Sequence, residues 1–167
     1  MCAKRLLLIR HAKSSWTDSS LADFERPLNS RGKRDAPFMG ELLNKKNVYP
    51  DLIVTSYAER AKRTAQIIAG KLGYSDEKII IDERLYEANY KDIIDVIRQT
   101  KNNIKVLFVF GHNPGLTTLH NFFCESYIDN IPTSGITEYE IREEWKNLSA
   151  KSLKLLSFEY PKKYLKD

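Results

Sequence analysis

The chain has 167 residues, of which 42% are hydrophobic and 29% are charged, and its formal net charge is +5; this balance predicts one soluble globular domain over residues 1–167. The positive charge suits an anionic substrate, but the basic residues are scattered and do not alternate with aromatic residues, so no nucleic-acid partner is expected. Near the N-terminus the apolar runs stop after four residues, which excludes a signal peptide's apolar region and a membrane span and predicts a cytoplasmic protein without a membrane partner.

The first predicted element is a buried strand. Four consecutive apolar residues over 6–9 run straight into an Arg-His pair, and a polar surface loop follows. Asn29 or Ser30 can then cap a helix that continues through Leu43. Pro37 lies inside this helix and is expected to kink or divide it.

Two further strand and helix pairs follow. A turn introduces a short buried strand over residues 50–56, and the next helix ends at Gly73, a suitable C′ residue. Residues 78–82 predict another strand. After a loop, residues 93–97 carry isoleucines on one face of a helix.

The last third of the chain predicts a change in strand direction. Residues 106–110 form another apolar strand, and the helix after it carries Phe122 and Phe123, which we expect in the core. Residues 136–141 alternate like a half-buried strand, and residues 153–160 can pair with them antiparallel. The whole pattern predicts an α/β fold, a three-layer α/β/α sandwich with a mostly parallel sheet and an antiparallel edge.

Charged side chains follow four of the predicted strands. In chain order they are Arg10 with His11, Arg60 with Arg63, Glu87, and His112. Because the carboxyl ends of parallel strands meet at one edge of a sheet, these side chains are expected around one crevice. Two histidines with two or three arginines make a cationic pocket, and a phosphoryl group is its natural ligand because guanidinium groups bind phosphoryl oxygens bidentately.

Three ordered blocks of sequence resemble the histidine phosphatase superfamily. Residues 8–13, Leu-Ile-Arg-His-Ala-Lys, resemble its Arg-His-Gly signature, with Ala12 in place of glycine. Residues 55–65 resemble its Ser-x-x-x-Arg-Ala-x-x-Thr-Ala segment, and residues 111–113 match its later Gly-His block. The resemblance covers about residues 4–140 and implies the phosphoglycerate-mutase-like fold.

Within that superfamily the chain is most similar to the SixA-type protein phosphohistidine phosphatases. Residues 26–32 share their Arg-Pro-Leu-x-x-x-Gly block, and residues 133–135 share their Thr-Ser-Gly segment. The resemblance implies a phosphorylated protein as the substrate, held in an open site, since the chain has little room for a covering insertion. Two alternatives remain, a phosphomonoesterase acting on a small phosphorylated metabolite and a non-catalytic phosphate-binding module. A monomer is the expected state.

The resemblance also implies a mechanism. Neutral His11 attacks phosphorus and becomes transiently phosphorylated, and water then releases phosphate. Arg10, Arg60 and His112 hold the phosphoryl oxygens. The reaction requires no metal and no cofactor, and the two cysteines form no CxxC pair that would make a thiolate metal site.

Four other residues keep two interpretations each. Glu87 is a proton donor or an ordinary surface charge. Arg26 closes the phosphate pocket as a substrate-binding residue or anchors its own loop. For Arg63 we expect a salt bridge on the helix surface, and for His120 a structural role.

Overall fold

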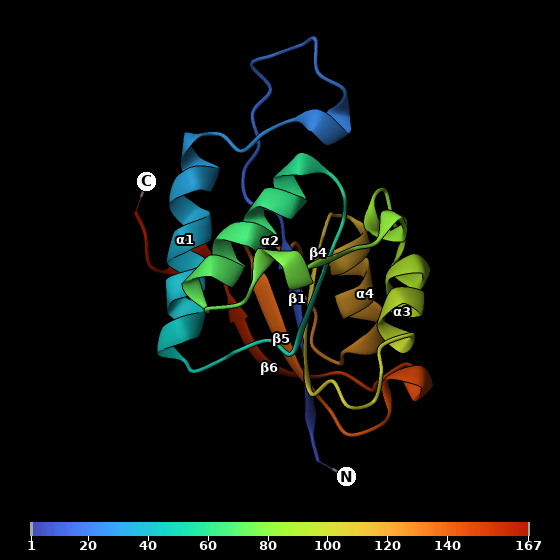
Figure 1. The fold of residues 1–167 in the computed structure, drawn as a ribbon. Helices are drawn as coiled ribbons and strands as arrows, with labels where there is room; N and C mark the ends of the chain where they lie inside the picture. The colour runs from blue at the N-terminus through green and yellow to red at the C-terminus, as the bar shows by residue number, and fades with distance from the viewer. Residues whose placement is uncertain (1, 167) are drawn as a thin grey trace.

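The computed structural model describes residues 2–166, which form one six-stranded sheet with helices on both faces (Figure 1). The strands are β1 (Lys4–Arg10), β2 (Leu52–Thr55), β3 (Ile80–Ile81), β4 (Val106–Gly111), β5 (Ile136–Ile141) and β6 (Lys154–Glu159). The helices are α1 (Ser30–Lys45), α2 (Glu59–Lys71), α3 (Tyr90–Arg98) and α4 (Gly115–Phe123). The predicted three-layer α/β/α architecture is confirmed.

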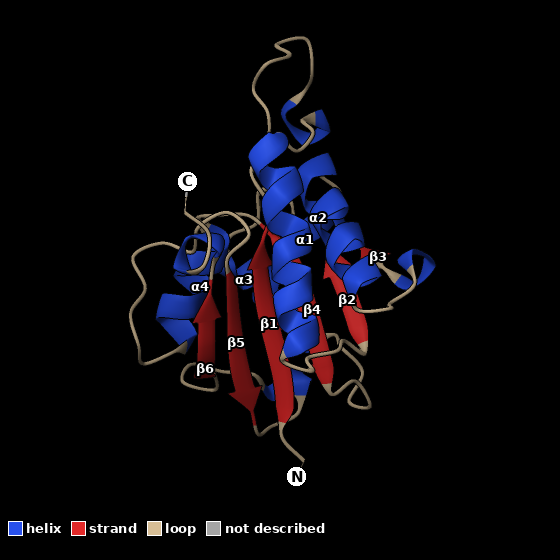
Figure 2. Cartoon of the chain, turned by 90° about the vertical axis from the view of Figure 1, so that its left-hand side faces the viewer, coloured by secondary structure: helices blue, strands red, loops and turns tan. Residues whose placement is uncertain are grey.

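The strand order is β3-β2-β4-β1-β5-β6. β1 pairs with β4 in parallel, and β4 pairs with β2 in parallel, so the ends of these strands lie side by side. β5 pairs antiparallel with both β1 and β6, which confirms the predicted antiparallel pairing of the last two strands. Figure 2 shows the segment between β1 and α1 projecting beyond the carboxyl ends of the parallel strands.

The apolar run of β1 serves both faces of the sheet. Successive strand residues point to opposite sides, so Leu6 and Leu8 join the core beneath α3 and α4 while Leu7 and Ile9 join the core beneath α1 and α2. All four are fully buried. The unbroken apolar stretch is therefore the pattern of a central strand covered on both sides.

Helix α1 begins where the sequence predicts and is not divided. Asn29 is its N-cap, and the Asn29 side chain accepts a hydrogen bond of 2.9 Å from the backbone N–H of Gly32. The helix continues through Pro37 to Lys45, so the expected division of the helix is wrong. A proline removes only one backbone donor, and the fifteen other residues keep the helix continuous.

Two other expectations need correction. The strand predicted over residues 78–82 is reduced to Ile80–Ile81, which lie at the edge of the sheet and are about half exposed. Phe123 is buried as predicted, but Phe122 is 59% exposed and stacks on Tyr90 with ring centroids 4.6 Å apart. Among the described residues, no helix combines the length and the apolar character needed to cross a membrane.

Candidate active site

The two predicted histidines meet at the carboxyl ends of neighbouring strands. His11 directly follows β1 and His112 directly follows β4, and the register of these strands places Arg10 opposite Gly111. The imidazole centroids of His11 and His112 are 5.1 Å apart. Residues separated by a hundred positions in the sequence therefore form one small site.

His11 is held as a neutral ring with one free nitrogen. Its Nδ1 lies 2.8 Å from the carbonyl oxygen of Ala12. A carbonyl can only accept, so Nδ1 donates and Nε2 keeps its lone pair. Burial lowers the pKa of His11 to about 3, and the nearby positive charges act in the same direction. The ring is thus unprotonated at Nε2 around neutral pH, as a nucleophile requires.

The ring of His112 is fixed by a serine. Its Nε2 lies 2.8 Å from the hydroxyl oxygen of Ser56, which also accepts a hydrogen bond from the backbone N–H of Ala58. When the Ser56 hydroxyl donates to Nε2, the proton of neutral His112 is on Nδ1. Burial first and the charge of Arg60 second lower the pKa of His112 to about 4.

Two arginines stand beside these rings. Arg60, in the first turn of α2, is 6% exposed and donates to Asp23 through Nη1 to the backbone carbonyl at 2.8 Å and through Nη2 to the carboxylate at 3.0 Å. Arg10 donates through Nη1 to the carbonyl of Ile131 at 3.0 Å, and burial together with Arg60 lowers its pKa. The positive charges of Arg10 and Arg60 both depress the histidine pKa values, so all four groups share one electrostatic environment.

Several buried polar atoms of this site have no hydrogen-bond partner among the described residues. They are Nε of Arg10, Nε of Arg60, Nδ1 of His112 and the hydroxyl of Ser134. Buried polar groups are rarely unpaired. Three nitrogens from three different segments therefore match a site that binds an anion.

Asp23 connects groups that the sequence analysis did not join. Its carboxylate accepts hydrogen bonds from Arg60, from Nε of Arg26 at 3.1 Å and from the hydroxyl of Tyr86 at 2.5 Å. The bond from Tyr86 contributes most to lowering the pKa of Asp23 to about 2. Its only local sequence signal is its position three residues before the arginine of the Arg-Pro-Leu block.

Arg26 anchors its own loop. Its guanidinium donates to the hydroxyl of Ser14 at 2.7 Å and lies 3.5 Å from the ring centroid of Trp16. Its charge is also among those that lower the pKa of His112. Arg26 therefore lies at the edge of the site, and its contacts with Ser14 and Trp16 hold it in place.

Among the described residues, Glu87 and Arg63 make no hydrogen bond or ion pair with the groups of this cluster. Glu87 is exposed, has a φ of 52°, and makes no hydrogen bond or ion pair with any described residue. Its charge helps to raise the pKa of Tyr86. Arg63 has no ion pair in the described part of the chain, so the expected salt bridge is wrong.

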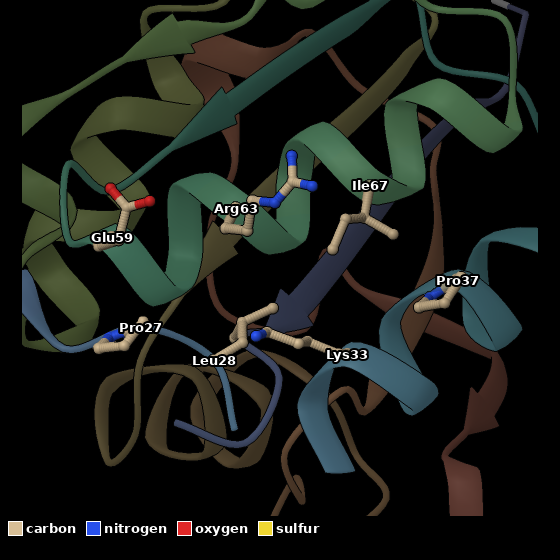
Figure 3. Close-up of a pocket in the computed structure, with 7 residues that line it drawn as sticks. All are labelled: Pro27, Leu28, Lys33, Pro37, Glu59, Arg63 and Ile67. Atoms are coloured by element: carbon tan, nitrogen blue, oxygen red, sulfur yellow. The ribbon is translucent and has the colours of Figure 1, made fainter. Parts of the chain in front are cut away.

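Arg63 instead lines a groove between α1 and α2 (Figure 3). The groove has a volume of about 510 Å³. Its lining residues are Pro27, Leu28, Lys33, Pro37, Glu59, Arg63 and Ile67. Neither histidine is among them, so this groove is separate from the histidine site.

The residue that departs from the family signature is fully buried. The methyl group of Ala12 joins a small apolar cluster with Leu28 and Ala36, and Ile67 packs against that cluster. The Ala12 N–H donates to the hydroxyl of Thr64 at 2.9 Å. The extra carbon therefore fills space behind the site while the Ala12 backbone still fixes His11.

The Thr-Ser-Gly segment holds the backbone on the other side of the nucleophile. The N–H of Ser134 donates to the carbonyl of His11 at 3.1 Å, and the N–H of Arg10 donates to the carbonyl of Gly135 at 3.0 Å. Ser134 is fully buried and has a φ of 61°.

No group of three or more His, Cys, Asp or Glu side chains in the described part of the chain is arranged to hold a metal ion.

His120 lies apart from the site. Its Nδ1 is 2.7 Å from the hydroxyl of Tyr139, and its Nε2 is 2.8 Å from the carbonyl of Ser126. Both ring nitrogens are therefore occupied in the core.

Comparison with known proteins agrees with this geometry. The histidine phosphatase superfamily (branch 1) matches residues 6–107. The uncharacterized protein Rv1276c of Mycobacterium tuberculosis is 30% identical over 166 residues, which cover 92% of this chain and 100% of that protein. Phosphoglycerate mutase 1 of Saccharomyces cerevisiae is 32% identical over 120 residues, which cover 71% of this chain and only 47% of the mutase.

Solved structures share the fold. The Agrobacterium tumefaciens protein assigned as phosphohistidine phosphatase SixA superimposes with a TM-score of 0.79 at 26% identity, covering 95% of this chain and 98% of that one. The protein histidine phosphatase SixA complexed with tungstate gives 0.82 at 15% identity, with the same coverage. The family match and the geometry of the site support a phosphatase. Because the family match spans more than half of the sequence and includes the first histidine, the chain belongs to the histidine phosphatase superfamily.

Proposed function

We propose that the chain is a phosphohistidine phosphatase that removes the phosphoryl group from a phosphohistidine of another protein through a covalent intermediate on His11. The observation that carries this proposal is the state of His11. Its Nδ1 is bonded to the carbonyl of Ala12, and burial lowers its pKa to about 3. A neutral imidazole with a free Nε2 is the nucleophile that transfer to histidine needs.

The first step exchanges one P–N bond for another. The lone pair of His11 Nε2 attacks phosphorus in line, and the bond between phosphorus and the substrate imidazole breaks. The leaving imidazole takes the bonding electron pair and is protonated from solvent. Arg10, Arg60 and the Nδ1–H of His112 bind the phosphoryl oxygens as charge shifts onto them. Each such donor is worth about 3 kcal/mol of transition-state stabilisation.

The second step returns the enzyme to its starting state. Water attacks the phosphorus on His11, the P–N bond breaks, and inorganic phosphate leaves. The Nε2 lone pair is restored, and the carbonyl of Ala12 keeps the ring in the same tautomer throughout.

The position of Glu87 fits a nitrogen leaving group. An imidazole leaves readily with a proton from solvent, whereas an alcohol is a poor leaving group without an acid. The exposed Glu87 makes no bond that would fix it against His11 or His112 in the described residues. For substrates with an oxygen leaving group, Glu87 stays the predicted proton donor.

A phosphoenzyme trap tests the proposal. Wild-type protein is incubated with a ³²P-phosphohistidine carrier protein in the presence of a chelator and quenched in alkali, and the label is located by peptide mapping. We expect acid-labile label on His11. The His11→Ala variant should carry no label, and its turnover should fall by at least about a thousandfold.

The third histidine supplies the matched control. His120→Gln removes a buried histidine outside the site, so thermal stability should fall while the label on His11 stays. Label on a hydroxyl group, or turnover that survives His11→Ala, would contradict the mechanism.

A further inference from the structure

A row of aromatic rings leads from the histidines to the surface. The ring centroid of Tyr86 lies 5.6 Å from that of His112, in an edge-on arrangement. Tyr57 follows at 4.9 Å from Tyr86, and Phe24 at 5.7 Å from Tyr57. Phe24 is 41% exposed, so the row runs from the buried site to solvent.

Each ring is tied to a group of the site. Tyr86 donates its hydroxyl to the carboxylate of Asp23, and Phe24 is the residue after Asp23. Tyr57 directly follows Ser56, the residue that orients His112. The hydroxyl of Tyr57 makes no hydrogen bond with the described residues, so its ring is the part that contributes to this surface.

We propose that Tyr57 and Tyr86, with Phe24 at the outer end, form a subsite for a planar aromatic leaving group. The direction of departure rests on the proposed function: the buried His11 attacks in line, so the leaving group departs from the opposite side of the phosphorus. The row starts at His112, whose ring centroid lies 5.1 Å from that of His11, and ends at the exposed Phe24.

The ring row distinguishes leaving groups by shape and charge. Aromatic rings prefer offset or edge-on partners at centroid distances of about 4.5–7 Å, and the rings of the row already pack on one another in that way. Phe24 is exposed and Tyr57 and Tyr86 are partly exposed, so a ligand ring would pack on the faces that these rings leave open. The imidazole of a phosphohistidine is planar, and protonation of its second ring nitrogen before the P–N bond breaks makes the ring cationic, so it is attracted to the faces of the tyrosine rings. A saturated group of similar size can make only apolar contacts with these rings.

A pair of non-hydrolysable ligands tests the subsite. Benzylphosphonate and cyclohexylmethylphosphonate carry the same anion and a ring of similar size, but only the first ring is aromatic. We expect calorimetry to show tighter binding of benzylphosphonate to the wild-type protein. Tyr57→Leu should reduce this preference by roughly three- to tenfold, the range of an aromatic pair, whereas Tyr57→Phe keeps the ring and should retain the preference.

The outcomes separate this subsite from the proposed function. Equal affinities of the wild type for the two phosphonates, no binding of benzylphosphonate, or a preference unchanged by Tyr57→Leu would each overturn the subsite. Phe24→Leu gives a second variant at the solvent end of the row, for which a smaller loss of preference is expected. A failed phosphoenzyme trap would instead remove the nucleophilic role of His11, because the affinity ratio does not depend on turnover.

Discussion

Asp23 reduces the electrostatic strain of a site crowded with positive charge. Arg60 and Arg26 both donate to its carboxylate, and its negative charge raises the pKa of His112 against the effect of the arginines. A carboxylate beside a phosphate site opposes anion binding through its charge. Its benefit is orientation, because it fixes Arg60 and Tyr86 in one arrangement before the ligand arrives.

Asp23→Asn tests whether the charge of Asp23 orients Arg60, because the substitution leaves the shape of the side chain unchanged. The variant keeps the shape of the side chain and the backbone carbonyl that binds Arg60, but it loses the charge that pairs with Arg60 and Arg26. We expect kcat/KM to fall by roughly 10- to 100-fold, the effect of a misplaced catalytic group. Steady-state kinetics with a phosphohistidine protein measures the change.

The neighbouring carboxylate gives the control for this variant. Glu25 accepts from the backbone N–H of Ala22 at 3.0 Å and makes no bond to Arg60. Glu25→Gln should therefore leave kcat/KM near the wild-type value. A wild-type kcat/KM for Asp23→Asn would show that Arg60 is positioned without the charge.

The sequence predicts the groups that follow strands but not the one that joins them. His11 and His112 stand out because each ends an apolar run, and strand ends converge in a parallel sheet. Asp23 lies 37 residues from Arg60 and 63 from Tyr86, in a single-turn 3₁₀ helix (Asp23–Glu25) between β1 and α1. No periodicity connects these positions, so only the folded chain reveals their contact.

Helix α1 is packed directly on the chain that leaves the nucleophile. A Cβ atom built on Gly32, in the first turn of α1, would lie 2.2 Å from the carbonyl oxygen of Lys13. Lys13 follows Ala12, whose carbonyl fixes the His11 ring. The glycine therefore allows a close approach between this helix and the backbone beside the site.

Two glycine substitutions in different helices should act in opposite directions. Gly32→Ala forces the backbone of α1 away from that of Lys13. It should lower the free energy of unfolding by roughly 1–3 kcal/mol, the usual range for overpacking, and it should also lower kcat/KM. Gly70→Ala, in α2, meets no atom within 4 Å and should stabilise the protein by about 0.5–1 kcal/mol. Urea denaturation of both variants measures the difference, and a destabilised Gly70→Ala would refute the packing explanation.

For whole elements, the sequence does not predict burial at positions where burial depends on which other elements cover the residue. The apolar residues of β1 and β4 are covered on both faces, and their runs predict them well. Ile80 and Ile81 are equally apolar but lie in the edge strand, with about half of each side chain exposed. Phe122 follows the helical pattern of α4 but stands on its outer side. Hydrophobicity alone does not distinguish a central position from a peripheral one.

Because His11 and His112 stay neutral in the folded state, the whole protein is less stable in acid. In the folded state the pKa of His11 is about 3 and that of His112 about 4, against an ordinary value of 6.5. Between these values the unfolded chain binds more protons than the folded one. The stability associated with the neutral rings is therefore complete above pH 6.5 and is lost progressively as pH falls toward 3.

Acid titration tests this linkage. The free energy of unfolding, measured with urea, should fall as the pH is lowered from 6.5 to 4, and His11→Ala should make that fall shallower. Ring carbon chemical shifts should report neutral His11 and His112 at pH 5.5 in the folded protein. A titration midpoint near 6.5 for either ring would contradict the burial effect.

The order of the strands also governs how the chain is assembled during synthesis. β1 is translated before the other five strands, yet its two neighbours in the sheet are β4 and β5, with Arg5 opposite Val106 and Ile9 opposite Ile136. Its apolar run therefore stays without a hydrogen-bonded partner until most of the chain has been made, and such non-local pairing is slow. β1, which His11 directly follows, is the first of the six strands to be translated but gains its first neighbour only when β4 has been made, so a truncated chain ending before β4 contains His11 without a site around it.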